Sequence, residues 1–71
     1  SLATMYHTEG VDAIATITEL RAETSELIDH VAETQRGVMI QKNNQPHAVL
    51  ISWDMYKKLR RRGAFEKVEA A

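Results

Sequence analysis

The most restrictive feature of this sequence is that 71 residues must fold without a single cysteine. A chain this short buries a smaller fraction of its surface than a typical domain, so its apolar core alone gives marginal stability. Disulfides and thiolate-bound metals, the usual reinforcements of small folds, are excluded. Burial against another chain remains, so we expect one domain that self-associates.

The sequence indicates neither a membrane protein nor an exported one. Its longest apolar run, from Ala48 to Ile51, is far shorter than the roughly 20 residues of a membrane-spanning helix. The first ten residues lack the basic start and apolar stretch of a signal peptide. We therefore expect no membrane association and, in line with the lack of cysteine, a cytoplasmic protein.

The first half of the chain predicts a strand followed by two short helices. Residues 1–12 are polar and show no period, so we expect a flexible N-terminal arm. Residues 13–18 alternate apolar and β-branched side chains, which favours a strand, and Thr18 can cap the helix that follows. Residues 19–34 are helical but interrupted near Ser25, which with Glu26 gives a second helix start.

The second half predicts a hairpin and a final helix. Residues 38–42 and 47–51 resemble strands, and the asparagines between them tolerate the positive φ of a tight turn. Ser52 is a good helix cap and Gly63 a good stop. Tyr56 and Leu59, three residues apart, are expected to dock together on the sheet.

The predicted order is therefore strand, helix, helix, strand, strand, helix. This is an α+β fold in which the helices pack on a small sheet. We place the folded domain at residues 13–62 and a C-terminal tail at residues 63–71.

Charge is unevenly distributed along the chain, although the net charge is only −1. Residues 1–35 contain seven acidic residues and one base, Arg21, whereas residues 36–71 contain eight bases and three acids. Such a split marks either an anion-binding surface or ordinary helix ends and solvated faces. For the basic run at residues 57–62, we favour the second interpretation, because cations complement the C-terminal end of a helix.

The order of elements, with the residues that fill them, resembles the Phd/YefM family of antitoxins, also called prevent-host-death proteins. The resemblance covers about Ile14 to Leu59, roughly two thirds of the chain. It rests on four segments in order: Thr16–Ala22, Ser25–Val31, Val38–Ser52 and Tyr56–Leu59. Each segment is a common helix or hairpin pattern, and their order and spacing are the specific signal.

The resemblance implies a symmetric dimer that binds operator DNA, represses its own operon and neutralises a toxin through its C-terminal side. In this family an arginine of the first helix commonly reaches the DNA, and Arg21 occupies that position. A basic residue at the end of the second strand does likewise, and Lys42 occupies it. Asn43 and Asn44, in the adjoining turn, have amides suited to phosphate or base edges.

Each of these assignments has a simpler alternative. Arg21 suits pairing with Glu19, Glu23 or Ser25, and lysines in turns are usually solvated. Phe65 and Val68 either begin a toxin-binding segment or complete the core. Trp53 is expected to be packed or at a dimer surface, rather than to stack on bases.

The alternative function is a protein-interaction module of the same fold that inhibits a partner without useful DNA binding. Glu23 motivates it, because a carboxylate stands there where the family usually has a neutral polar residue. The short segment after the last helix also limits the surface for a toxin.

Catalysis and metal binding are not indicated. His7, His30 and His47 are far apart and lack the spacing of metal ligands. Ser25 and Ser52 suit helix caps better than nucleophiles, and there is no glycine-rich phosphate loop. We expect no enzyme activity, no cofactor and no small-molecule substrate.

Overall fold

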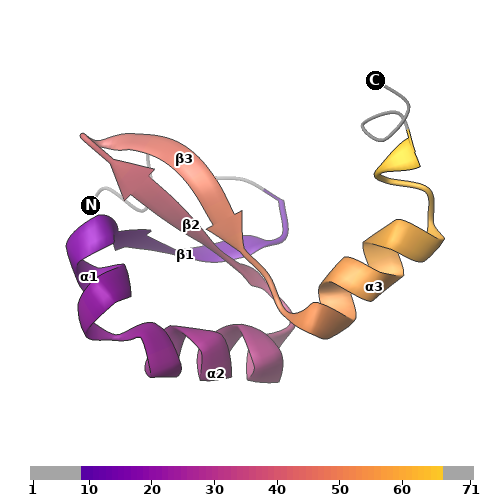
Figure 1. Cartoon of the computed structure of the whole chain (residues 1–71), viewed down its shortest axis with the longest axis horizontal. Coiled ribbons are helices and arrows are strands. Elements are labelled where there is room, and N and C mark those ends of the chain that lie inside the picture. The colour runs from indigo at the N-terminus through magenta and orange to yellow at the C-terminus, as the bar shows by residue number, and fades with distance from the viewer. Residues whose placement is uncertain (1–8, 67–71) are drawn as a thin grey trace.

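The computed structural model describes residues 9–66, which form a three-stranded sheet and three helices (Figure 1). In chain order the elements are β1 (Val11–Thr16), α1 (Ile17–Ala22), α2 (Thr24–Thr34), β2 (Gly37–Lys42), β3 (Gln45–Leu50) and α3 (Trp53–Arg61). This order and the α+β class confirm the prediction from sequence.

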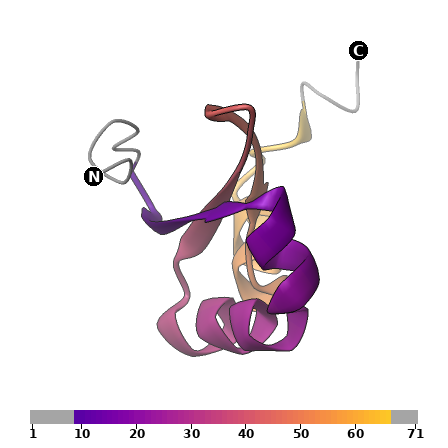
Figure 2. The same cartoon turned by 90° about the vertical axis from the view of Figure 1, so that its left-hand side faces the viewer.

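The sheet combines one parallel and one antiparallel pair of strands. Its order is β1-β2-β3, with β1 parallel to β2 and β2 antiparallel to β3. Parallel strands need a crossover connection, which α1 and α2 provide, meeting at a sharp corner (Figure 2). The parallel register pairs Thr16 with Gln41, so the end of β1 lies beside the end of β2.

The core between the sheet and the first two helices is small. Its buried members are Ala15, Val31, Val38 and Ile40, and only Val38 is completely enclosed. Partly buried apolar side chains from both helices complete it, among them Leu20 and Leu27. On the strands, Val38 and Ile40 face the helices, whereas Val49 on the opposite face is 51% exposed.

The boundary between β1 and α1 lies two residues earlier than the sequence analysis placed it. The strand begins at Val11, inside the segment assigned to the arm, and Thr16 rather than Thr18 caps α1. The Glu19 N–H donates to Thr16 Oγ1 at 3.1 Å, and the Thr16 N–H donates to Glu19 Oε1 at 2.9 Å. This reciprocal pair is a capping box, which satisfies two amides at once and so selects the earlier start.

The break between the two helices and the tight turn confirm their predictions, but the second helix begins earlier than predicted. Glu23 separates α1 from α2 in a non-helical conformation, and α2 begins at Thr24, so Ser25 lies inside the helix and does not start or cap it as predicted. The chain leaves α2 at Gln35, which adopts a left-handed conformation at φ 56°. Gly37 already belongs to β2, whereas Asn43 and Asn44 form the two-residue turn at φ 53° and 63°. Two consecutive positive φ values characterise the turn that matches strand twist.

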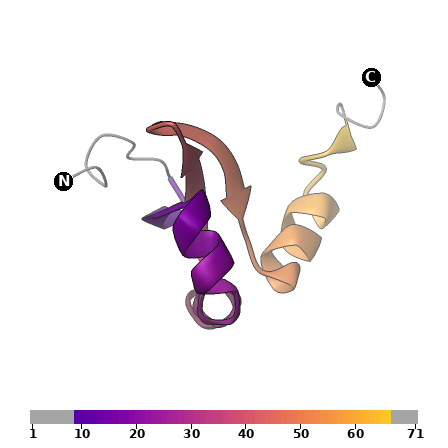
Figure 3. The same cartoon turned by 60° about the vertical axis from the view of Figure 1, so that its left-hand side comes forward.

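The last helix begins and ends as predicted, but it does not pack on the sheet as expected. The Met55 N–H donates to Ser52 Oγ at 3.0 Å, and Gly63 ends the helix at φ 82°. Figures 1 and 3 show α3 set apart from the sheet and from α1 and α2. Tyr56 stacks instead between Trp53 and Phe65, whereas Leu59 lines a different groove. The predicted joint docking of Tyr56 and Leu59 is therefore wrong.

Gly37→Ala is expected to lower the free energy of unfolding by about 1–3 kcal/mol, the usual cost of overpacking. A Cβ atom at residue 37 would lie 2.8 Å from Val49 Cγ1 and 3.4 Å from Val11 Cγ2. Val49 is stiff about its first side-chain torsion, so relief requires movement of the strands. Urea unfolding would measure the loss, and Gly37→Val should lose more. Equal stability of Gly37→Ala and wild type would contradict this account.

Candidate nucleic-acid interface

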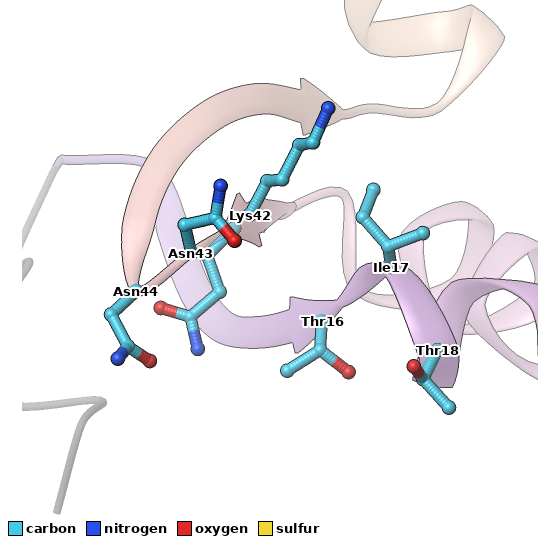
Figure 4. Close-up of a pocket in the computed structure, with 7 residues that line it drawn as sticks. Thr16, Ile17, Thr18, Lys42, Asn43 and Asn44 are labelled. Carbon is cyan, nitrogen blue, oxygen red and sulfur yellow. The ribbon is translucent and has the colours of Figure 1, made fainter.

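A polar hollow lies where the β2–β3 turn meets the start of α1 (Figure 4). It encloses about 240 Å³. The parallel pairing of Thr16 with Gln41 creates it, because this register places the N-terminus of α1 next to the turn. The residues that line it are Thr16, Ile17, Thr18, Gln41, Lys42, Asn43 and Asn44.

The turn projects its two asparagines from the end of the hairpin. Both Asn43 and Asn44 are exposed, and both are fixed in the left-handed region by the two-residue connection between Lys42 and Gln45. Their side-chain amides each offer two donors and an acceptor. The turn therefore carries hydrogen-bonding groups suited to phosphate oxygens or base edges.

Lys42 continues the alternation of β2, so it lies on the same side of the sheet as Ile40 and the first two helices. Figure 4 shows its ammonium group and Ile17 on one side of the backbone, and the hydroxyl groups of Thr16 and Thr18 on the other. Lys42 is exposed and forms no ion pair with any residue between 9 and 66. Its charge is available to a ligand on the α1 side of the hollow.

Arg21 lies one helical turn after Ile17, outside the hollow but on a neighbouring part of α1. It is exposed and has no ion pair within the described part of the chain, so the predicted alternative of pairing with Glu19 or Glu23 is not seen there. Glu19, two residues earlier, lies on a different side of α1, where its carboxylate accepts the Thr16 N–H. Ile17 thus links Lys42 to Arg21 along one surface.

Three polar residues of the hollow, Thr16, Thr18 and Gln41, were not predicted as site residues by the sequence analysis. Gln41 is 4% exposed, and its Oε1 accepts no hydrogen bond from the described residues. An enclosed acceptor without a donor costs about 1–3 kcal/mol. No sequence signal identifies any of the three as part of a site, because their proximity depends on the register between β1 and β2.

Phe65, one of the two residues assigned to partner binding, lies beyond α3, away from the polar hollow. Phe65 stacks on Tyr56 with ring centroids 5.2 Å apart, and Tyr56 stacks on Trp53 at 5.4 Å. Val68 lies outside the described residues. The structure therefore brings Lys42, Asn43 and Asn44 into one hollow with Arg21 nearby, and separates Phe65 from all of them.

The histidines within residues 9–66 do not form a metal site, and no group of possible metal ligands gathers there. His30 Nε2 lies 3.3 Å from Asp12 Oδ1, and Arg36 Nε lies 3.8 Å from the other oxygen of the same carboxylate. These contacts tie α2 and the loop after it to β1. His7 lies outside the described residues. The helices that the structure describes include none long and apolar enough to cross a membrane.

Comparisons with known proteins agree with this architecture. Among curated protein sequences, none matches the chain significantly. Among solved structures, a chain of the RelBE2 toxin-antitoxin complex from Mycobacterium tuberculosis has a similar fold, with a TM-score of 0.64 and 24% sequence identity. That match covers 84% of this chain and 75% of that chain. The sequence model described as antitoxin Phd_YefM, type II toxin-antitoxin system, matches residues 12–71. The chain therefore belongs to the Phd/YefM family of type II antitoxins.

Proposed function

We propose that this antitoxin binds operator DNA as a homodimer, represses its own operon and neutralises a partner toxin by direct binding, without catalysis. The observation that carries the DNA role is the grouping of Arg21 and Lys42, two cations that form no ion pair among residues 9–66, with the Asn43–Asn44 turn. All four residues are exposed. Such a surface offers charge for phosphates together with amides for base edges.

Two copies related by a dyad would present this surface twice. A palindromic operator repeats its half-sites at a spacing of one helical turn of DNA, about 34–36 Å, or a multiple of it. Each protomer would meet one half-site with Arg21 and Lys42. Because Arg21 belongs to α1 and Lys42 to the end of β2, next to the tight turn, their spacing is set before DNA arrives.

The surface proposed for dimerisation is an apolar groove between α3 and the open face of the sheet. It encloses about 430 Å³ and includes Val11, Val49, Ile51, Met55 and Leu59. Val49 is 51% exposed, and the chain's own core has a single fully enclosed side chain. Covering this groove with the same region of a second copy would supply the apolar burial that one short chain lacks.

For the toxin, we propose contact through the segment that follows Gly63, with Phe65 and Val68 as its apolar contacts. The stack of Phe65 on Tyr56 fixes the start of that segment to α3. The structural neighbour comes from a toxin-antitoxin complex, which supports a toxin partner for this chain. The alternative, an inhibitor without useful DNA affinity, is favoured by the exposed acidic residue Glu23, two residues after Arg21.

Binding to the DNA upstream of the chain's own gene separates these two functions. We expect a gel shift at low salt that weakens as salt rises. In a plot of the logarithm of the binding constant against the logarithm of the salt concentration, each phosphate neutralised should contribute about −0.9 to the slope. Sedimentation of the same samples should give two copies per DNA site. The lack of any shift at low salt would leave only the interaction-module function.

A further inference from the structure

An exposed aromatic hollow on α3 is used by none of the contacts proposed above. Trp53, the first residue of the helix, is 67% exposed and stacks on Tyr56 with an interplanar angle of 16°. Together with Arg60 these rings line a hollow of about 490 Å³. Tryptophan, tyrosine and arginine are the side chains most enriched at the centres of protein interfaces. The hollow borders the apolar groove at Ile51, which lines both, but Trp53, Tyr56 and Arg60 do not line that groove.

The outer side of α2 has complementary chemistry. Leu27 and Val31 face the core, whereas Ile28 is 51% exposed and has exposed Asp29 beside it. From Thr24 to Thr34 the helix contains three acidic residues and no lysine or arginine. It therefore presents a large aliphatic side chain within an acidic surface.

These two surfaces do not meet within one chain. Figures 1 and 3 show α3 projecting away from α2, and no ion pair joins the two helices among residues 9–66. In α3, the four bases Lys57, Lys58, Arg60 and Arg61 exceed the single acid, Asp54, which is itself paired with Lys57 at 3.5 Å. The basic helix and the acidic helix are therefore both available to another molecule.

We propose that α2 of one copy docks on the Trp53–Arg60 hollow of a second copy, with Ile28 against Trp53 and Asp29 near Arg60. An apolar centre surrounded by opposite charges is the usual anatomy of a protein interface. The contact lies apart from the apolar groove, so it joins one dimer to the next. It goes beyond the proposed function, because it needs neither DNA nor toxin.

The consequence is assembly that extends beyond a dimer. When such a contact between two different surfaces forms head to tail, it does not close on itself after two copies, so it can continue from dimer to dimer. On DNA with neighbouring sites, a bound dimer would help the next to bind. Because the contact depends on charge, it should weaken as salt shortens the screening length, which is about 10 Å at 0.1 M.

Trp53 is the only tryptophan in the chain, so its fluorescence reports on this hollow alone. At low salt, rising protein concentration should shift its emission to the blue and reduce quenching by acrylamide. The change should coincide with species larger than a dimer in sedimentation velocity. High salt should reverse the fluorescence change and dissociate the large species. Emission and quenching that do not depend on concentration at low salt would overturn the proposal.

Charge exchange tests the pairing itself. Asp29→Lys and Arg60→Glu should each weaken the low-salt association on the order of tenfold, because each places like charges together. An equal mixture of the two variants, or both changes in one chain, should restore it. Glu23→Lys makes the same change in charge as Asp29→Lys at the first residue before α2, and should leave the association intact.

Two further results would count against this contact. If Trp53 is still protected from acrylamide quenching in both single variants, some other surface covers it. A double variant no better than the singles would rule out the pairing of α2 with α3. If the large species form as predicted but upstream DNA is not bound, the proposed DNA function fails while this contact stands.

Discussion

Replacing Leu59 with aspartate is expected to abolish dimerisation and, with it, most of the stability of the fold. Leu59 lies in the apolar groove with Val49 and Ile51, in the surface proposed to cover a second copy. Loss of a buried leucine costs about 2–5 kcal/mol, and a carboxylate in an apolar interface adds a desolvation cost. A dimer would lose these amounts at two symmetry-related positions.

The measurement is thermal unfolding over a range of protein concentrations, together with sedimentation. For wild type, the unfolding temperature should rise with concentration, because folding is coupled to association. For Leu59→Asp it should be lower and independent of concentration. Arg61→Asp is the control, since residue 61 is exposed and lies two positions further along α3, on a different side. A folded wild-type monomer at micromolar concentration would refute the proposal.

The elements whose signals are local could be predicted from sequence. Ser52 caps α3, Gly63 ends it, and two asparagines form the turn of the hairpin, each by chemistry contained within a few residues. The start of α1 was misplaced because Thr16 and Thr18 are both suitable caps. The choice depends on the glutamate three residues after Thr16, which completes a capping box.

The parts that depend on tertiary arrangement could not be predicted in this way. Lys42 and the asparagines adjoin in sequence, so their grouping follows from the hairpin. Gln41 and Thr16 meet only because β1 and β2 are parallel in one register. Likewise, the three-residue spacing of Tyr56 and Leu59 indicates an apolar face on α3. The spacing does not say whether the chain's own sheet or another surface covers that face. In the structure Leu59 lines a groove.

The charge asymmetry noted in the sequence also acquires a spatial meaning. Four of the seven acids of the first half lie in α1 and α2, whereas five of the bases of the second half lie at residues 57–62 of α3 and its cap. Arg21 is the one base of the acidic half. It lies outside the polar hollow, one helical turn after Ile17, which lines it. The candidate DNA surface therefore depends on Arg21 and Lys42, rather than on the longer basic run.

Replacing Arg21 or Lys42 with alanine is accordingly expected to weaken operator binding while leaving the fold intact. Both side chains are exposed and unpaired within residues 9–66, so their removal costs the fold little. If Arg21 contacts a base edge, Arg21→Ala should lose about 1–3 kcal/mol, roughly 5- to 150-fold in affinity, and relax selectivity at one position of each half-site. The double variant should lose specific binding.

Salt dependence distinguishes the kind of contact that is lost. A phosphate contact would weaken binding to all sequences alike and reduce the salt slope by about one unit per contact, hence by about two for a symmetric dimer. Fluorescence anisotropy on operator and scrambled DNA, over a series of salt concentrations, measures affinity, selectivity and slope together. Arg36→Ala is the matched control, because Arg36 is an exposed arginine already paired with Asp12. If Arg21→Ala and Lys42→Ala behave like this control in all three quantities, neither residue contacts DNA and the polar hollow is not the operator-binding surface.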